Sequence, residues 1–224
     1  MRRTSLVLLL LATLCPPLTW AQDEHPITGR KIAPVMGMGG AEWLERSERE
    51  IEDMPETALD AIGLKPGMKV ADVGAGVGYF SLRLSKRVGA EGVVYANDVQ
   101  PEMLAMLKER AAKAGVTNIR VILGTESDPK LPKNTFDLVL MVDVYHELSQ
   151  PQAMLDRLRT SLKDDGRLVL IEYRKEDPHI PIRAEHKMSV SEAKQEVEAE
   201  GYHLDKVLED LPRQHILIFR KSVQ

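Results

Sequence analysis

Cysteine is almost absent from this sequence. Of its 224 residues only Cys15 is a cysteine, and it lies within an N-terminal stretch that has the layout of a cleaved leader. A mature chain without cysteine can form no disulfide and carries neither a thiolate nucleophile nor a cysteine metal site. The core is therefore expected to be stable through packing alone.

An excess of charge of either sign is also missing. The chain has 30 basic and 34 acidic residues, which gives a formal net charge of −4. Nucleic-acid-binding proteins usually carry clustered Lys and Arg, so the composition gives no support to a nucleic-acid partner. Hydrophobic residues make up 43% of the chain, which is ample for a single core.

The N-terminal apolar run is too short to span a bilayer. It extends over Leu6–Leu14, well below the roughly 20 residues that a membrane-spanning helix needs. Arg2 and Arg3 precede it, and small residues lead up to Ala21, which is the layout of a secretory signal peptide cleaved after Ala21. We expect an exported, periplasmic protein without stable membrane insertion; translation from Met36 would instead give a cytoplasmic one.

The residues after this leader are expected to form an arm and two helices. Residues 23–40 are rich in Gly, Pro and Met and read as an extended arm, and "AEWLERSEREIED" then places Leu44, Ser47 and Ile51 on one helical face. A second short helix begins at Pro55. Two interpretations remain open for Trp43 and the methionines of the arm: a lid over a ligand, or simple packing on the domain. The expected organisation is a signal peptide (1–21), an N-terminal arm with helices (22–62) and one domain (63–224).

Apolar strands and amphipathic helices alternate from Lys69 onward. Strands are predicted at residues 69–73, 92–98, 119–124, 136–143 and 166–173, with helices at 78–88, 101–114 and 151–162 between them. This alternation predicts an α/β fold in which right-handed crossovers build a parallel sheet with helices on both faces. After a further helix, the strands "HLDKVLED" and "HILIFRK" are separated only by "LPRQ", which predicts an antiparallel hairpin.

A glycine-rich loop, "VADVGAGVGYF" at residues 70–80, follows the first predicted strand and opens a helix. Gly74, Gly76 and Gly78 permit a tight turn and a close approach of a ligand to the backbone. Asp72 beside the loop would repel a diphosphate by on the order of 1 kcal/mol or more. S-adenosylmethionine carries an ammonium and a sulfonium group but no phosphate, so the loop and its acid together predict this cofactor.

A second acid, Asp98, ends the second predicted strand, where a carboxylate can accept hydrogen bonds from ribose hydroxyls. Val99 next to it could pack on the adenine. The alternative is that Asp98 merely caps the helix that begins near Pro101.

These residues resemble the class I S-adenosylmethionine-dependent methyltransferases, on the glycine loop, "VVYANDVQPEML", "FDLVLMVDVYHEL" and the terminal hairpin. The resemblance runs from about Gly63 to the C-terminus. It implies a Rossmann-like, mostly parallel sheet of seven strands in the order 3-2-1-4-5-7-6, and methyl transfer to a small-molecule acceptor by in-line displacement. The cofactor-binding residues that it implies are Asp72, Gly74, Ala75, Gly76, Gly78, Tyr79, Asp98, Val99, Thr125, Glu126, Asp143 and Val144. The chain departs from the family after the third strand, where Thr125, Glu126 and Asp128 compete to contact the adenine.

Candidates for acting on the acceptor cluster after the fourth predicted strand, in "DVYHEL". His146 is the obvious general base, with Tyr145 beside it, because histidine titrates near neutrality. The alternative is a capping or buried hydrogen-bonding histidine.

Residues 173–189 could form a basic rim for an anionic acceptor, or simply a solvated loop. No two histidines stand at a clear ligand spacing, so the sequence predicts no metal. Two other functions remain open: an exported binding protein without catalysis, and a nicotinamide-dependent oxidoreductase. The sequence predicts neither the acceptor nor an oligomeric state.

Overall fold

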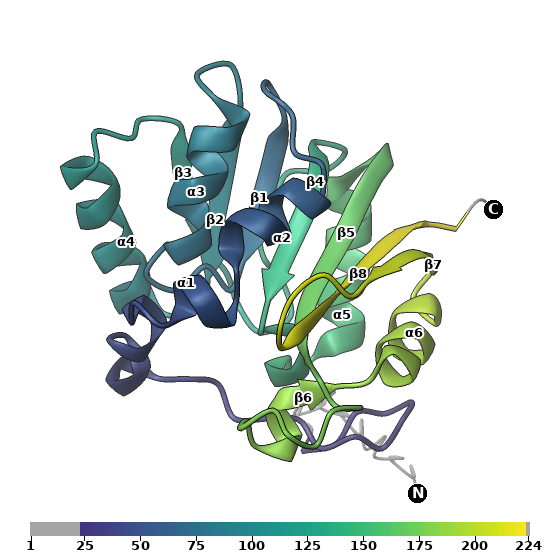
Figure 1. Cartoon of the computed structure of the whole chain (residues 1–224). Coiled ribbons are helices and arrows are strands. Elements are labelled where there is room, and N and C mark those ends of the chain that lie inside the picture. Colours follow the sequence, from purple (N-terminus) through teal and green to yellow (C-terminus); the bar gives the residue numbers. More distant parts are fainter. Residues whose placement is uncertain (1–22, 223–224) are drawn as a thin grey trace, which may run out of the picture.

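The computed structural model describes residues 23–222 (Figure 1). The predicted signal peptide lies outside these residues. Within them, no helix is both long and apolar enough to cross a membrane.

The core of the structure is an eight-stranded sheet in the order β3-β2-β1-β4-β5-β8-β7, with the short β6 paired to β5. Strands β1 to β5 run parallel to one another, and β8 is antiparallel to both β5 and β7. The predicted α/β fold, strand order and terminal hairpin are therefore confirmed, with β6 as an addition. The strands are β1 Lys69–Val73, β2 Val93–Asp98, β3 Ile119–Leu123, β4 Phe136–Val142, β5 Leu162–Arg174, β6 Lys187–Met188, β7 Tyr202–Leu208 and β8 Gln214–Lys221.

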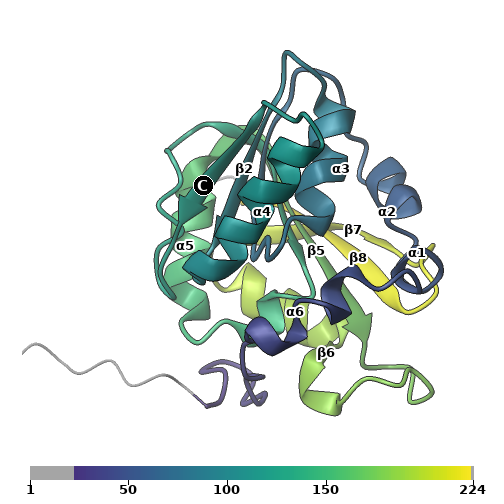
Figure 2. The same cartoon turned by 90° about the vertical axis from the view of Figure 1, so that its left-hand side faces the viewer.

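Helices cover both faces of the sheet (Figure 2). They are α1 Arg49–Glu52, α2 Pro55–Ala61, α3 Tyr79–Val88, α4 Pro101–Lys113, α5 Pro151–Ser161 and α6 Val190–Glu198. Successive residues of β1 point to opposite faces. Val70 packs with Leu84 of α3 on one face, and Ala71 packs with Leu155 of α5 on the other. Both faces of β1 are thus buried, and only the ends of the parallel strands are left to form a site.

The segment before the sheet differs from the predicted amphipathic helix. It breaks into three short turns, namely η1 Met38–Gly40, η2 Trp43–Glu45 and α1. Ile51, predicted on the buried face, is 79% exposed, whereas Arg49 is buried. The prediction was wrong because Arg49 is stabilised inside: its Nε donates to Asp53 Oδ2 at 2.6 Å and its guanidinium lies 4.1 Å from the centre of the Tyr79 ring.

The arm and the turns that follow it, residues 23–48, which are together called the arm from here on, pass across the carboxyl ends of the parallel strands (Figure 1). It is fastened to α6 by Arg30, whose Nε and Nη2 donate to the two carboxylate oxygens of Glu196, each at 3.1 Å. Arg30 Nη1 also donates to the His146 carbonyl at 3.1 Å. Arg30, Glu196 and the neighbouring His25 are all buried. This buried ion pair fixes the arm beside the loop that follows β4.

Candidate functional site

The glycine loop turns sharply at the carboxyl end of β1. The amides of Gly74 and Ala75 both donate to the Asn97 carbonyl of β2 at 2.9 Å. Gly74 has φ +74°, and a Cβ there would lie 2.4 Å from a methyl carbon of Val144. Only glycine lets this loop lie so close to the segment after β4.

Asp98 faces the loop from the end of β2. Its Oδ2 accepts from the Gly76 amide at 2.8 Å and its Oδ1 accepts from the Gln100 amide at 2.9 Å. Gln100 is the N-cap residue of α4, so Asp98 orders the turn before the helix and makes no bond to the first helical amides. Each carboxylate oxygen keeps a free lone pair, and Asp98 lines the main cavity, where ribose hydroxyls could bind.

Asp72 lies on a smaller pocket that adjoins the loop. Gly74, Gly76 and Arg49 line the same pocket. The Asp72 carboxylate is buried and accepts a hydrogen bond from Ser81 Oγ at 2.5 Å. Burial raises the pKa of Asp72 to about 6, with a further contribution from the negative charge of Asp98. The pocket is therefore lined by one carboxyl group and one guanidinium group.

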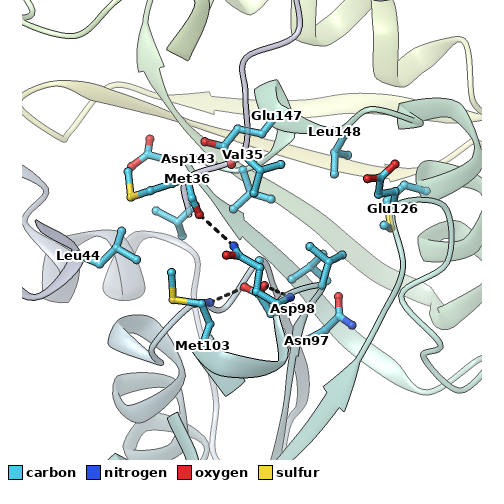
Figure 3. Close-up of a pocket in the computed structure, with 18 of the residues that line it drawn as sticks. Val35, Met36, Leu44, Asn97, Asp98, Met103, Glu126, Asp143, Glu147 and Leu148 are labelled. Atoms are coloured by element: carbon cyan, nitrogen blue, oxygen red, sulfur yellow. Dashed lines mark hydrogen bonds between the residues drawn. The ribbon is translucent and has the colours of Figure 1, made fainter. Parts of the chain in front are cut away.

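The arm forms part of the wall of the main cavity. Val35, Met36, Trp43 and Leu44 line it, and Gln100 Nε2 donates to the Met36 carbonyl at 2.9 Å. Of the two interpretations left open for the arm, this geometry fits the lid. Figure 3 shows Asp143 and Glu147 on the side of Met36, and Asp98 and Asn97 on the opposite side.

The three residues that compete for the adenine occupy different places. Glu126 lines the cavity, whereas Thr125 and Asp128 are not among its lining residues. Those two bond each other instead: the Thr125 amide donates to the Asp128 carbonyl at 2.8 Å, and the Asp128 amide donates to Thr125 Oγ1 at 3.0 Å. Glu126 is therefore the one of the three that is placed to reach a ligand.

Val99 and Val144 line the main cavity, and Ala75 and Tyr79 line the smaller pocket. The phenol of Tyr79 donates to Glu50 Oε1 at 2.8 Å, and burial together with this bond raises the pKa of Tyr79 to about 12. Tyr79 therefore contributes an uncharged ring.

Asp143 lines the cavity from the residue directly after β4. It has φ +53°, a conformation that aspartate adopts more readily than most residues. Its Oδ2 accepts from Gln214 Nε2 at 2.7 Å, and its Oδ1 is buried without a hydrogen-bond partner among the described residues. Burial and the nearby carboxylates of Asp53 and Glu172 raise the pKa of Asp143 well above its usual value.

The two residues predicted to be catalytic lie behind the cavity wall. Tyr145 and His146 are both buried and neither lines the cavity, whereas Glu147, the third residue of the same turn (η3, Tyr145–Glu147), does. Glu172 Oε1 accepts from the Tyr145 amide at 2.8 Å, and Glu172 Oε2 lies 2.6 Å from His146 Nδ1. The Nε2 of His146 lies 3.1 Å from the Nδ1 of His186.

The pKa values of His146 and Glu147 are both raised, for different reasons. Burial alone would lower the pKa of His146, but the Glu172 carboxylate outweighs it and raises the pKa above its usual value. Burial raises the pKa of Glu147 to about 7, against the opposing effect of His146. Both pKa values therefore differ from the usual ones, that of Glu147 on the cavity wall and that of His146 directly behind it.

The predicted basic rim of residues 173–189 is not assembled around the cavity. None of these residues is among those that line it. Tyr173 is buried, Arg174 pairs with Glu209, and His179 is exposed. Only His186 approaches the site, through His146.

Sequence reasoning missed Arg49 and the closeness of His186 to His146. Arg49 belongs to α1, a segment with no motif of its own, and the fold brings it to the glycine loop. His186 follows His146 by 40 residues, so no local spacing could reveal the pair.

Comparison with known proteins agrees with this geometry. Residues 64–211 match the family described as a methyltransferase domain. The chain resembles the crystal structure of a SAM-dependent methyltransferase from Aquifex aeolicus, with 33% identity and a TM-score of 0.78 over 83% of this chain and 98% of that one.

Two curated relatives match shorter stretches. The ubiquinone/menaquinone biosynthesis C-methyltransferase of Idiomarina loihiensis is 29% identical over 52% of this chain and 47% of its own length. The protein-L-isoaspartate O-methyltransferase of Pyrococcus horikoshii is 33% identical over 50% and 47%. The matches thus span about half the length of these relatives.

Proposed function

Because this chain belongs to the methyltransferase domain family and S-adenosylmethionine is its cofactor, we propose that it transfers the cofactor's methyl group to a small-molecule acceptor by in-line displacement. Such a displacement requires the acceptor nucleophile, the methyl carbon and the sulfur to be aligned. Holding them so supplies much of the rate acceleration.

The observation that carries the proposal is the pairing of charges beside the glycine loop. Asp72 and Arg49 line one small pocket, which suits the ammonium and the carboxylate of the methionine part. Asp98, with both oxygens oriented by backbone amides, suits the ribose hydroxyls in the adjoining cavity. A dinucleotide diphosphate would meet two carboxylates here, which disfavours a nicotinamide cofactor.

The acceptor is proposed to bind where the arm and the segment after β4 face each other. Met36 and Leu148 offer apolar contacts there, and Asp143 and Glu147 offer carboxyl groups. Because the arm forms part of its wall, the cavity suits a small molecule better than a polymer. The name of the matched C-methyltransferase of ubiquinone/menaquinone biosynthesis supports the same class of acceptor.

Calorimetry with S-adenosylmethionine and S-adenosylhomocysteine tests the donor half of the proposal. We expect both to bind the mature chain and NADH to give neither heat nor a thermal shift. Transfer itself is tested by incubating methyl-labelled donor with a panel of phenols, quinols, amines and organic acids. Binding without any S-adenosylhomocysteine formed across the panel would favour the non-catalytic binding protein instead.

We also propose that the protein is exported and cleaved after Ala21. Its supports are the layout of residues 1–21 and the burial of His25, Arg30 and Ala33, which translation from Met36 would remove. Sequencing the N-terminus of the native protein tests this. A mature chain that begins at residue 22 is expected, and one that begins at Met36 would contradict it.

A further inference from the structure

Three potential metal ligands converge at the acceptor side of the cavity. His146 Nε2 and His186 Nδ1 lie 3.1 Å apart, and Glu147 Oε1 lies 3.9 Å and 3.7 Å from them, respectively. Two ligands that are each 2.0–2.1 Å from a tetrahedral zinc ion are about 3.3 Å apart. The three atoms therefore need shifts of only about half an ångström to surround one ion.

The ring of His146 is held in place by a buried carboxylate. Its Nδ1 lies 2.6 Å from Glu172 Oε2, and Glu172 is fully buried with its other oxygen bonded to the Tyr145 amide. A carboxylate at this position accepts the proton of Nδ1, so Nε2, which faces His186 and Glu147, is the ring nitrogen left to bind a metal. Metal-binding histidines are characteristically supported by such a carboxylate.

The two histidines come from elements that are fixed independently. The His146 carbonyl accepts from Arg30 and from the Ala33 amide of the arm. His186 ends the turn η4 (Ala184–His186), directly before β6, which pairs with β5. The rings meet edge to face, 5.1 Å between centres and 82° between planes. The pair is therefore set by the fold rather than by a flexible surface loop.

From this geometry we propose that His146, His186 and Glu147 bind one divalent transition-metal cation of the zinc class. Two imidazoles and a carboxylate are a donor set that zinc takes in catalytic sites, where a fourth position stays open. Glu147 lines the cavity, so the ion would lie at the cavity wall, within reach of a bound acceptor. The buried Glu172 carboxylate behind His146 adds a negative charge next to the three ligands, which favours a cation.

The site would also act on the acceptor, and this step rests on the proposed function. An acceptor hydroxyl would occupy the open position, where coordination lowers its pKa and its proton passes to solvent. The oxygen then attacks the methyl carbon as the bond from carbon to sulfur breaks, and S-adenosylhomocysteine leaves with the electron pair of that bond.

Metal binding can be measured without knowing the acceptor. Tag-free protein is stripped with a chelator and titrated with Zn²⁺ by calorimetry, and with Co²⁺ by visible absorption. We expect one ion per chain, and a cobalt band that Zn²⁺ abolishes. Absence of a single stoichiometric site, or a cobalt spectrum identical to that of the free ion, would overturn the inference and leave a hydrogen-bonded histidine pair.

Variants locate the site. His186→Ala and Glu147→Gln should each weaken Zn²⁺ binding at least tenfold, and Glu172→Gln about 10- to 100-fold through the ring of His146. His179→Ala is the matched control, because this exposed histidine lies on the same loop and touches none of the ligands. Its affinity should match the wild type; an equal loss in His179→Ala and His186→Ala would refute the assignment. Circular dichroism confirms that each variant is folded.

The same stripped protein is also titrated with S-adenosylhomocysteine. Binding of this nucleoside without any metal uptake would refute the metal site alone. Metal uptake without nucleoside binding would refute the proposed function and leave the site standing.

Discussion

The two ends of the cavity are built in different ways. The donor end, made by the loop of residues 74–78 and by Asp98, consists largely of backbone amides within one strand–loop–helix unit and its neighbouring strand. The acceptor end, made by Asp143, Glu147 and the histidine pair, depends on side chains that β5, the loop before β6 and the arm bring together. Apart from Arg49 of α1, the donor end is therefore formed by one local unit, whereas the acceptor end exists only once distant segments dock.

This difference implies a division of roles. A site formed by backbone geometry tolerates little variation, because the loop conformation itself is the binding surface. A site formed by docked segments can change its chemistry without disturbing the sheet, as surface loops commonly do on shared folds. We expect the cofactor to be fixed by the first region and the acceptor by the second.

The largest expected effect comes from undocking the arm with Glu196→Ala. The change would leave Arg30 buried without its partner, and breaking a buried ion pair in this way costs about 3–5 kcal/mol. For a chain of this size the melting temperature should fall by about 10 °C. Thermal unfolding followed by circular dichroism measures the change.

The same variant sharpens the comparison when its donor affinity is measured. If the donor end is locally complete, S-adenosylhomocysteine should still bind the folded variant within about tenfold of the wild-type affinity. Replacing Arg30 and Glu196 together with Met removes both charges and should restore most of the stability. A Glu196→Ala variant as stable as the wild type would show that the ion pair between Arg30 and Glu196 is not what holds the arm in place.

The sequence predicted the donor end far better than the acceptor end, for a physical reason. Period-two and helical patterns act over a few residues, and they were enough for the α/β class and the terminal hairpin, whereas the strand order was implied by the resemblance to the methyltransferase family. The helix predicted over residues 41–53 was wrong because Ile51 fits an apolar face that the fold never buries, while Arg49 is buried through a specific ion pair. Pairing across 40 residues, as in His146 and His186, leaves no trace in local patterns.

The next effect in size should follow from Asp98→Ala at the donor end. A hydrogen bond to a charged group contributes about 1.5–3 kcal/mol, so losing bonds to both ribose hydroxyls should weaken nucleoside binding at least 100-fold. Calorimetry with S-adenosylhomocysteine measures the loss. Asp98→Asn is the control that keeps an acceptor for the Gly76 amide, and it should lose less. Unchanged affinity in both variants would contradict the role of Asp98.

A pH dependence should also distinguish the two ends. The pKa of Asp72 is about 6 in the free protein because the carboxyl is buried and lies near the negative charge of Asp98. Only the ionised carboxylate attracts the donor's ammonium, so affinity should be constant above pH 7 and fall about tenfold between pH 7 and pH 5. Calorimetry across this range provides the profile, and Asp72→Asn should flatten it.

The raised pKa of Asp72 also makes the stability of the fold depend on pH. Because the pKa of Asp72 is raised above its unfolded value, the folded state binds the proton more tightly. The contribution of Asp72 to stability is therefore favourable at low pH and is lost as the pH rises through about 6. For the binding prediction, the contradicting result is a donor affinity that increases on acidification, which would place the ammonium away from Asp72.

The smallest expected effect concerns Glu126, at the rim of the donor end. Glu126 lines the cavity and already accepts a hydrogen bond from Ser149 Oγ at 2.9 Å, so the proposed bond to the adenine amino group should add only about 1 kcal/mol. Glu126→Ala should weaken S-adenosylhomocysteine binding about fivefold, as measured by calorimetry. Asp128→Asn is the matched control, because it removes a charge from the same loop while keeping the oxygen that accepts from the Lys130 amide. A larger loss in the control than in Glu126→Ala would move the adenine contact to Asp128, and with it the boundary of the donor end.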